Sequence, residues 1–164
     1  MKKILLLVLF ITNLYLIKSQ TYFDFNADDF NGNKVVLSEM LDKGPVVLTF
    51  WRYWCPPCTR ELVALEKIYE KYEDKGLQVV GVCGDPIKYY DTTHTILKIN
   101  DIRFVNVYDT DNKIQETYKD FNGYGLYPCC IMIGSNKTIS YYNTAFTLGK
   151  DEIILENEVK KLFN

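Results

Sequence analysis

The sequence predicts an α/β fold in which helices cover one sheet. Short apolar runs typical of buried strands alternate with longer runs of helical periodicity. The strand-like runs are almost continuously apolar, which is typical of parallel strands covered on both faces and joined by right-handed crossovers. A length of 164 residues, with 48% hydrophobic and 24% charged residues, suits one globular domain.

The first twenty residues differ from the rest. Two lysines precede an apolar run at residues 4–17, and a short polar stretch ends it. This pattern predicts a secretory signal peptide in residues 1–20 and an exported, periplasmic domain in residues 21–164. The run is shorter than the ~20 residues that a membrane-spanning helix needs, which favours cleavage and a soluble product. An uncleaved N-terminal anchor remains the alternative.

The domain is expected to begin with a β-hairpin over residues 28–37. Its Asn31-Gly32 dipeptide suits a tight turn with positive φ. Ser38 is expected to cap a short helix over residues 39–41.

A strand at residues 46–51 and a helix from Pro56 to about Lys75 are expected next. The strand is apolar on both faces, and the helix carries one apolar stripe. Gly76 is the expected end of that helix, and a second buried strand follows at residues 77–83.

The remaining elements continue the alternation. Asp85, immediately before Pro86, is expected to cap a helix that runs to residue 99. We further expect a strand at 103–108, a helix at 113–120, paired strands at 129–133 and 138–142, and an amphipathic helix at 151–163.

The sequence Cys55-Pro56-Pro57-Cys58 lies where the first buried strand gives way to a helix. Free backbone N–H groups and the helix dipole favour a thiolate on Cys55 at this N-terminus. Cys58 lies one turn further on, within reach of a disulfide. The spacing therefore predicts a redox pair.

Composition excludes several other functions. A net charge of −2 without a charged block implies neither nucleic acid nor an anionic membrane as partner. A zinc site needs about four ligands, but the chain has only one histidine, His94, and no second Cys-x-x-Cys pair. We therefore expect no metal and no cofactor.

The chain resembles the exported TlpA/ResA-type thiol–disulfide oxidoreductases of the thioredoxin fold. Three features carry the resemblance over residues 25–163: Phe50-Trp51-x-x-Trp54-Cys55-Pro56-Pro57-Cys58, the N-terminal hairpin, and Tyr127-Pro128 before an apolar strand. It implies a thioredoxin-like fold with a hairpin extension and a strand–helix insert before a cis-proline.

The resemblance also implies roles for the residues of the motif. Cys55 would attack, Cys58 would resolve the mixed disulfide, and Trp54 would shield one side of the site. The backbone of Tyr127, placed by Pro128, would bind an extended client segment. The partners implied are client proteins with disulfides or thiols and a membrane electron donor of the cytochrome c maturation type.

Some positions depart from the relatives. Thr49 stands where thioredoxins have a buried Asp that accepts the proton of the resolving thiol. The ResA type instead uses a Glu after the next strand, and Asp85 lies close to that position. Cys129 stands where Thr is common after the cis-proline. Cys83, Cys129 and Cys130 are expected to be buried small residues; alternatively, Cys129 is a third redox thiol.

Two other functions remain open beside a reductant. A peroxiredoxin-like peroxidase has a related fold, but its reaction requires a Thr three residues before the attacking cysteine. This chain has Arg52 at that position. A non-enzymatic binding module would hold a static Cys55–Cys58 disulfide.

Overall fold

The computed structural model describes residues 22–122 and 125–163. The expected signal peptide, residues 1–20, lies outside the described residues. Within the described ranges, no helix is both long enough and apolar enough to cross a membrane.

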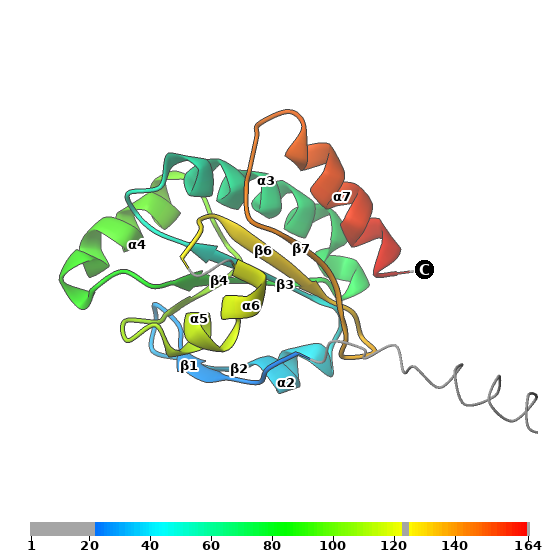
Figure 1. Ribbon diagram of the computed structural model, residues 1–164, viewed down its shortest axis with the longest axis horizontal. Coiled ribbons are helices and arrows are strands. Elements are labelled where there is room, and N and C mark those ends of the chain that lie inside the picture. The colour runs from blue at the N-terminus through cyan, green and yellow to red at the C-terminus, as the bar shows by residue number, and fades with distance from the viewer. Residues whose placement is uncertain (1–21, 123–124, 164) are drawn as a thin grey trace, which may run out of the picture.

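The described residues form a mixed sheet in the order β5-β4-β3-β6-β7 (Figure 1). Its strands are β3 (Val46–Trp51), β4 (Gln78–Cys83), β5 (Val105–Tyr108), β6 (Cys129–Ile133) and β7 (Ile139–Asn143). The first three run parallel, whereas β6 and β7 are antiparallel to their neighbours. This is the thioredoxin-like α/β fold that the sequence predicts.

Helices cover both faces of the sheet (Figure 1). One side carries α3 (Pro56–Tyr72), α4 (Tyr90–Ile99) and α7 (Asp151–Lys161). The other carries α2 (Leu37–Leu41), α5 (Lys113–Thr117), α6 (Lys119–Asn122) and the hairpin of β1 (Asn26–Asp28) and β2 (Lys34–Val36). Short 3₁₀ turns, η1 (Glu73–Lys75) and η2 (Ile87–Tyr89), follow α3 and precede α4.

The central strand β3 explains why two cores form. All six of its residues are buried, because successive side chains point to opposite covered faces. Trp51 packs in the core under α3 and α7, whereas Phe50 packs in the core above α2 and the hairpin. The expectation of a strand covered on both faces is confirmed.

Strand register brings three loops to one edge of the sheet. Trp51 at the end of β3 pairs with Cys83 at the end of β4, and Phe50 pairs with Cys129 at the start of β6. The segments after β3, after β4 and before β6 therefore meet at this edge, where sites form in open α/β sheets.

Several expected boundaries need correction. Ser38 is not a helix cap: it lies inside α2, whose N-cap is Val36 without a side-chain bond, and its own N–H binds Asp24.

The strand expected at 103–108 begins two residues later, because the N–H groups of Arg103 and Phe104 bind the Glu66 carboxylate. The single helix expected at 113–120 is two short helices, α5 and α6.

Other expectations hold. Gly76 has a φ of 95° after η1, and this left-handed conformation ends the helix as expected. The hairpin turn contains Gly32 at a φ of 82°. The insert expected after Cys83 consists of α4 and β5.

Candidate functional site

Cys55 and Cys58 form a disulfide at the first turn of α3. Their sulfur atoms are 2.10 Å apart and their Cα atoms 5.2 Å apart. Cys55 is the N-cap residue, with extended backbone angles, and Cys58 lies inside the helix. The spacing that predicted a redox pair thus corresponds to a bonded pair in the folded chain.

The two prolines between them leave few hydrogen-bond donors at this helix start. Pro56 and Pro57 occupy the first two helical positions and have no N–H group. The N–H of Cys58 is 3.2 Å from Cys55 Sγ and points to it. After reduction, the same N–H and the positive end of the helix dipole stabilise a Cys55 thiolate.

Cys55 and Cys58 differ slightly in exposure. Cys55 retains 4% of its surface exposed, whereas Cys58 is fully buried. Both residues are thus buried, and of the two only Cys55 has any surface open to another molecule.

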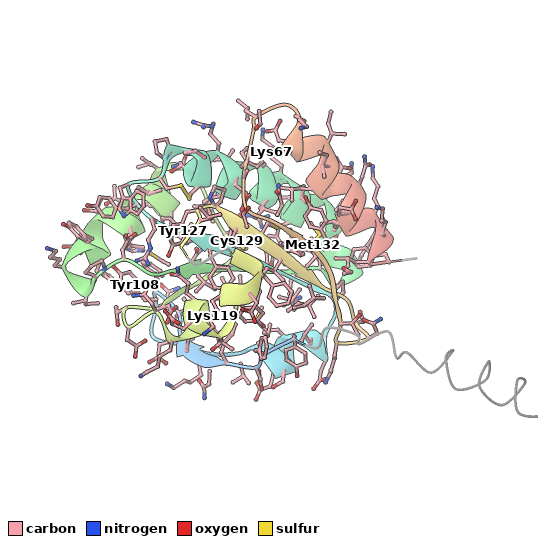
Figure 2. The ribbon with its side chains drawn as sticks, in the orientation of Figure 1. Lys67, Tyr108, Lys119, Tyr127, Cys129 and Met132 are labelled. Carbon is pink, nitrogen blue, oxygen red and sulfur yellow. A yellow bond between two sulfur atoms is a disulfide. The ribbon has the colours of Figure 1, made fainter. Side chains whose placement is uncertain are left out.

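Trp54 and Tyr127 border the exposed side of the pair. Trp54 is 59% exposed, and its ring meets the Tyr127 ring edge to face at 6.1 Å. The Tyr127–Pro128 peptide bond is cis, as the resemblance implied, and Pro128 is buried. Figure 2 shows Tyr127 and Cys129 where β6 begins, the edge to which register also brings the motif.

Glu61 is a site residue that the sequence reasoning missed. It lies three residues after Cys58, only 1% exposed, and Thr49 donates a 2.6 Å hydrogen bond to its Oε1 atom. Its Oε2 atom is buried without a hydrogen-bond partner among the described residues. Burial raises the pKa of Glu61 to about 8; the Thr49 bond opposes this rise, and the nearby Asp151 carboxylate adds to it.

One signal in the sequence pointed to this carboxylate. Residues three or four apart share a helix face, so Glu61 belongs to the same face as Cys58 and Leu65, both buried. A glutamate on the buried face must either find a partner or stay protonated. Thr49, which stands where thioredoxins have an acid, is that partner.

Asp85 is buried next to the motif, but it does not cap a helix. The turn η2 begins at Ile87, and its N-cap, Pro86, has no side-chain bond. Asp85 Oδ2 instead accepts a 2.7 Å hydrogen bond from the N–H of Tyr53, in the motif loop. The expected helix cap is therefore wrong, and Asp85 supports the loop that carries Cys55.

The three remaining cysteines are fully buried. Burial raises the pKa of Cys129 to about 12 and raises the pKa values of Cys83 and Cys130 as well. Cys130 faces the core under α3, and Cys129 faces the opposite core. The expectation that all three are buried small residues is confirmed.

No group of three or more potential metal ligands occurs in the part of the chain that the structure describes. The site consists of two sulfurs, a buried carboxyl group and an aromatic border. Chemically, this arrangement can exchange two electrons and a proton.

Comparison with known proteins gives one family match. The AhpC/TSA family profile matches residues 19–142. Thiol-disulfide oxidoreductase ResA of Bacillus cereus is 32% identical over 95 residues, which are 58% of this chain and 53% of that protein. ResA of Geobacillus thermodenitrificans is 28% identical over 131 residues, 79% of this chain and 70% of its own. The chain thus spans about half the length of the first of these curated relatives.

Solved structures share the fold. A Chlorobium tepidum protein described as a candidate thiol:disulfide interchange protein DsbE has a TM-score of 0.78 and 25% identity, covering 91% of this chain and 99% of its own. A secreted Mycobacterium tuberculosis disulfide oxidoreductase homologous to Escherichia coli DsbE has a TM-score of 0.71 and 20% identity, covering 84% and 95%.

Proposed function

Because this chain belongs to the AhpC/TSA family and has the thioredoxin-like fold, we propose that it is an exported thiol–disulfide oxidoreductase that reduces client proteins. The observation that carries the proposal is the Cys55–Cys58 pair at the start of α3, with only Cys55 reachable from solvent. The names of the ResA and DsbE relatives agree with this chemistry.

The reaction proceeds in two exchanges. The Cys55 thiolate attacks one sulfur of a client disulfide, forming a mixed disulfide and releasing the other client sulfur as a thiolate that takes a proton from water. The Cys58 thiol then loses its proton and attacks Cys55 Sγ, which releases the second client sulfur. Two electrons pass to the client, and the Cys55–Cys58 disulfide forms.

Glu61 receives the proton of Cys58 in the second exchange. It lies one helical turn beyond Cys58, and its Oε2 atom is free of other bonds among the described residues. A carboxyl group with a pKa of about 8 can both take and release a proton near neutral pH. Asp85 Oδ2 accepts the Tyr53 N–H, and Asp85 Oδ1, which is also buried without a hydrogen-bond partner among the described residues, lies 4.0 Å from Arg52 Nη1, so we assign Asp85 to supporting the loop.

The client binds as an extended segment beside Tyr127 and Pro128, whose backbone offers hydrogen bonds like those of an added strand. Trp54, whose ring contacts that of Tyr127, shields one side of the site. A membrane protein of the cytochrome c maturation type returns the electrons. Residues 1–20 direct export, and residues 21–164 form the working domain, cleaved or N-terminally anchored.

Reduction of insulin disulfides in the presence of dithiothreitol tests the proposal. The wild type should accelerate turbidity, and Cys55→Ser should abolish the acceleration. In a separate reaction, pre-reduced Cys58→Ser freed of dithiothreitol should accumulate a mixed disulfide with insulin, because the resolving thiol is missing. Acceleration that survives Cys55→Ser would reject the proposal.

A peroxide-consumption assay separates this function from its nearest rival. The AhpC/TSA match makes a peroxidase the second candidate. Arg52, which stands where the peroxidase chemistry wants Thr, favours a reductase, so we expect no hydrogen peroxide consumption above a Cys55→Ser control. A Cys55–Cys58 bond that dithiothreitol fails to reduce would instead favour a binding module.

A further inference from the structure

Arg52, three residues before Cys55, joins the motif loop to the segment before the cis-proline. Its Nη2 atom lies 2.7 Å from the Tyr127 hydroxyl oxygen and 2.6 Å from Asn112 Oδ1. The guanidinium also lies over the Tyr127 ring, 4.9 Å from its centre. Since Arg52 is only 14% exposed, these charge-assisted bonds are largely shielded from water.

The Tyr127 hydroxyl group both accepts and donates a hydrogen bond. It accepts from Arg52 and donates to Gln115 Oε1. Gln115 Oε1 is in turn 3.1 Å from the same Arg52 nitrogen. Arg52, Tyr127 and Gln115 therefore form a closed set of hydrogen bonds that holds the Tyr127 ring in place.

Gly84 provides the space for this guanidinium. A Cβ atom on Gly84 would lie 2.8 Å from Arg52 Cζ, from Arg52 Nη2 and from Asn112 Oδ1, the oxygen that accepts a hydrogen bond from Nη2. A glycine immediately after β4 thus leaves room for the side chain of Arg52 against the backbone. The space that the guanidinium occupies is therefore part of the fold, and residues from three separate segments line it.

The other side of Arg52 faces Asp85, which lies 4.0 Å from Nη1 and accepts the Tyr53 N–H. The motif loop, the end of β4 and the segment before Pro128 are consequently linked through one side chain. We call this set, Arg52 with Gly84, Asp85, Gln115 and Tyr127, the arginine clamp.

We propose that Arg52 is a positioning residue: through the arginine clamp it holds Tyr127 in the orientation that an extended client segment needs, and so sets client affinity rather than sulfur chemistry. This inference rests on the proposed function. A binding surface that is already ordered loses less conformational entropy when a client docks, so a free Tyr127 weakens binding. A small disulfide, which has no segment to lay beside Tyr127, is unaffected.

Three variants open the clamp from different sides: Arg52→Met, Tyr127→Phe and Gly84→Ala. The last leaves both Arg52 and Tyr127 in the chain and displaces the guanidinium by the added methyl group. For insulin we expect each variant to raise KM about fivefold to tenfold with kcat unchanged, the size of effect that loss of a charge-assisted hydrogen bond gives. In Arg52→Met and Gly84→Ala, the rate with the small disulfide 5,5′-dithiobis(2-nitrobenzoate) should stay at the wild-type value.

The KM of the double variant R52M/Y127F for insulin should not exceed that of R52M alone, because both changes open the same clamp. Tyr118→Phe is the matched control: it removes a buried hydroxyl group bonded to the Phe23 carbonyl and leaves every side chain of the arginine clamp in the chain. It should lower stability and leave both substrates at wild-type KM. Wild-type KM for insulin in Tyr127→Phe and Gly84→Ala, or an equal rise in the control, would overturn the proposal.

Hydrogen exchange of the backbone amides of residues 125–127 keeps the two proposals distinguishable. If the wild type fails to reduce insulin, the proposed function fails, but the clamp still predicts about tenfold faster exchange there in Arg52→Met and Gly84→Ala than in Tyr118→Phe. Equal exchange in all three would reject the clamp regardless of activity.

Discussion

Thr49 donates a 2.6 Å hydrogen bond to Glu61, and both side chains are buried in the core, out of contact with solvent. The bond joins the central strand β3 to the first turns of α3, directly behind Cys58. A carboxyl group in this position has consequences for stability as well as for chemistry.

Stability should fall as pH rises through the range set by Glu61. Its pKa is raised from the ordinary 4.5 to about 8 in the folded chain. Below pH 4.5 the Glu61 carboxyl group keeps its proton in both the folded and the unfolded chain, so the unfolding free energy does not change. Between pH 4.5 and about pH 8 the carboxyl group ionises only in the unfolded chain. The favourable contribution of the protonated group is thereby lost, on the order of 4 to 5 kcal/mol. Urea midpoints of the oxidised protein at pH 5, 7 and 9 measure this.

Glu61→Gln supplies the comparison for that experiment. Glutamine keeps the Thr49 bond and cannot ionise, so its midpoint should change much less between pH 5 and pH 9. A wild type and a Glu61→Gln variant with parallel pH profiles would show that Glu61 does not titrate as we describe.

Glu61→Gln should also slow the second exchange. Without a proton acceptor near Cys58, resolution of a preformed mixed disulfide is expected to slow by roughly 10²-fold at pH 7, the usual contribution of a general base. Attack by Cys55 on a small disulfide should change less. Quenched-flow measurement of mixed-disulfide decay separates the two steps, and equal decay in both proteins would contradict the assignment.

Asp85 should act on the fold and leave the proton transfer unchanged. Asp85→Ala leaves the Tyr53 N–H unpaired and removes the carboxylate beside Arg52, so we expect a loss of about 2 to 4 kcal/mol in unfolding free energy. Asp85→Asn keeps an oxygen for Tyr53 and should lose less. A flattened pH profile of mixed-disulfide decay in Asp85→Asn would make Asp85, and not Glu61, the proton acceptor.

Alkylation should distinguish Cys55 from the other four cysteines. In the reduced protein, a thiolate at a helix N-terminus reacts with iodoacetamide, whereas buried thiols such as Cys129, with a pKa of about 12, do not. We expect one labelled site, Cys55, within minutes at pH 7, identified by mass spectrometry. Labelling of Cys129 at a similar rate would support a third redox thiol.

The fold could be predicted from the sequence because its evidence is local. Buried strands such as residues 46–51 are nearly continuous apolar runs, and Gly76 marks a helix end by its own conformational freedom. The Cys55–Cys58 pair was equally visible, since a turn of helix separates the two residues whatever surrounds them.

The surroundings of the site could not be predicted in the same way, because they depend on contacts between distant segments. Asp85 looked like a helix cap, yet the pairing of Trp51 with Cys83 places it beside the Tyr53 N–H. Glu61 reads as one more charge on a helix until Thr49 and the core are placed around it. Such roles follow from strand register and burial, which the sequence alone does not specify.

The reduction potential of the Cys55–Cys58 pair tests the central claim most directly. The protein can be equilibrated with dithiothreitol buffers of known ratio and the reduced fraction counted by alkylation. A client reductant should have a potential near that of thioredoxin, ~−270 mV. A potential near ~−120 mV, that of a strong oxidant, would contradict the account.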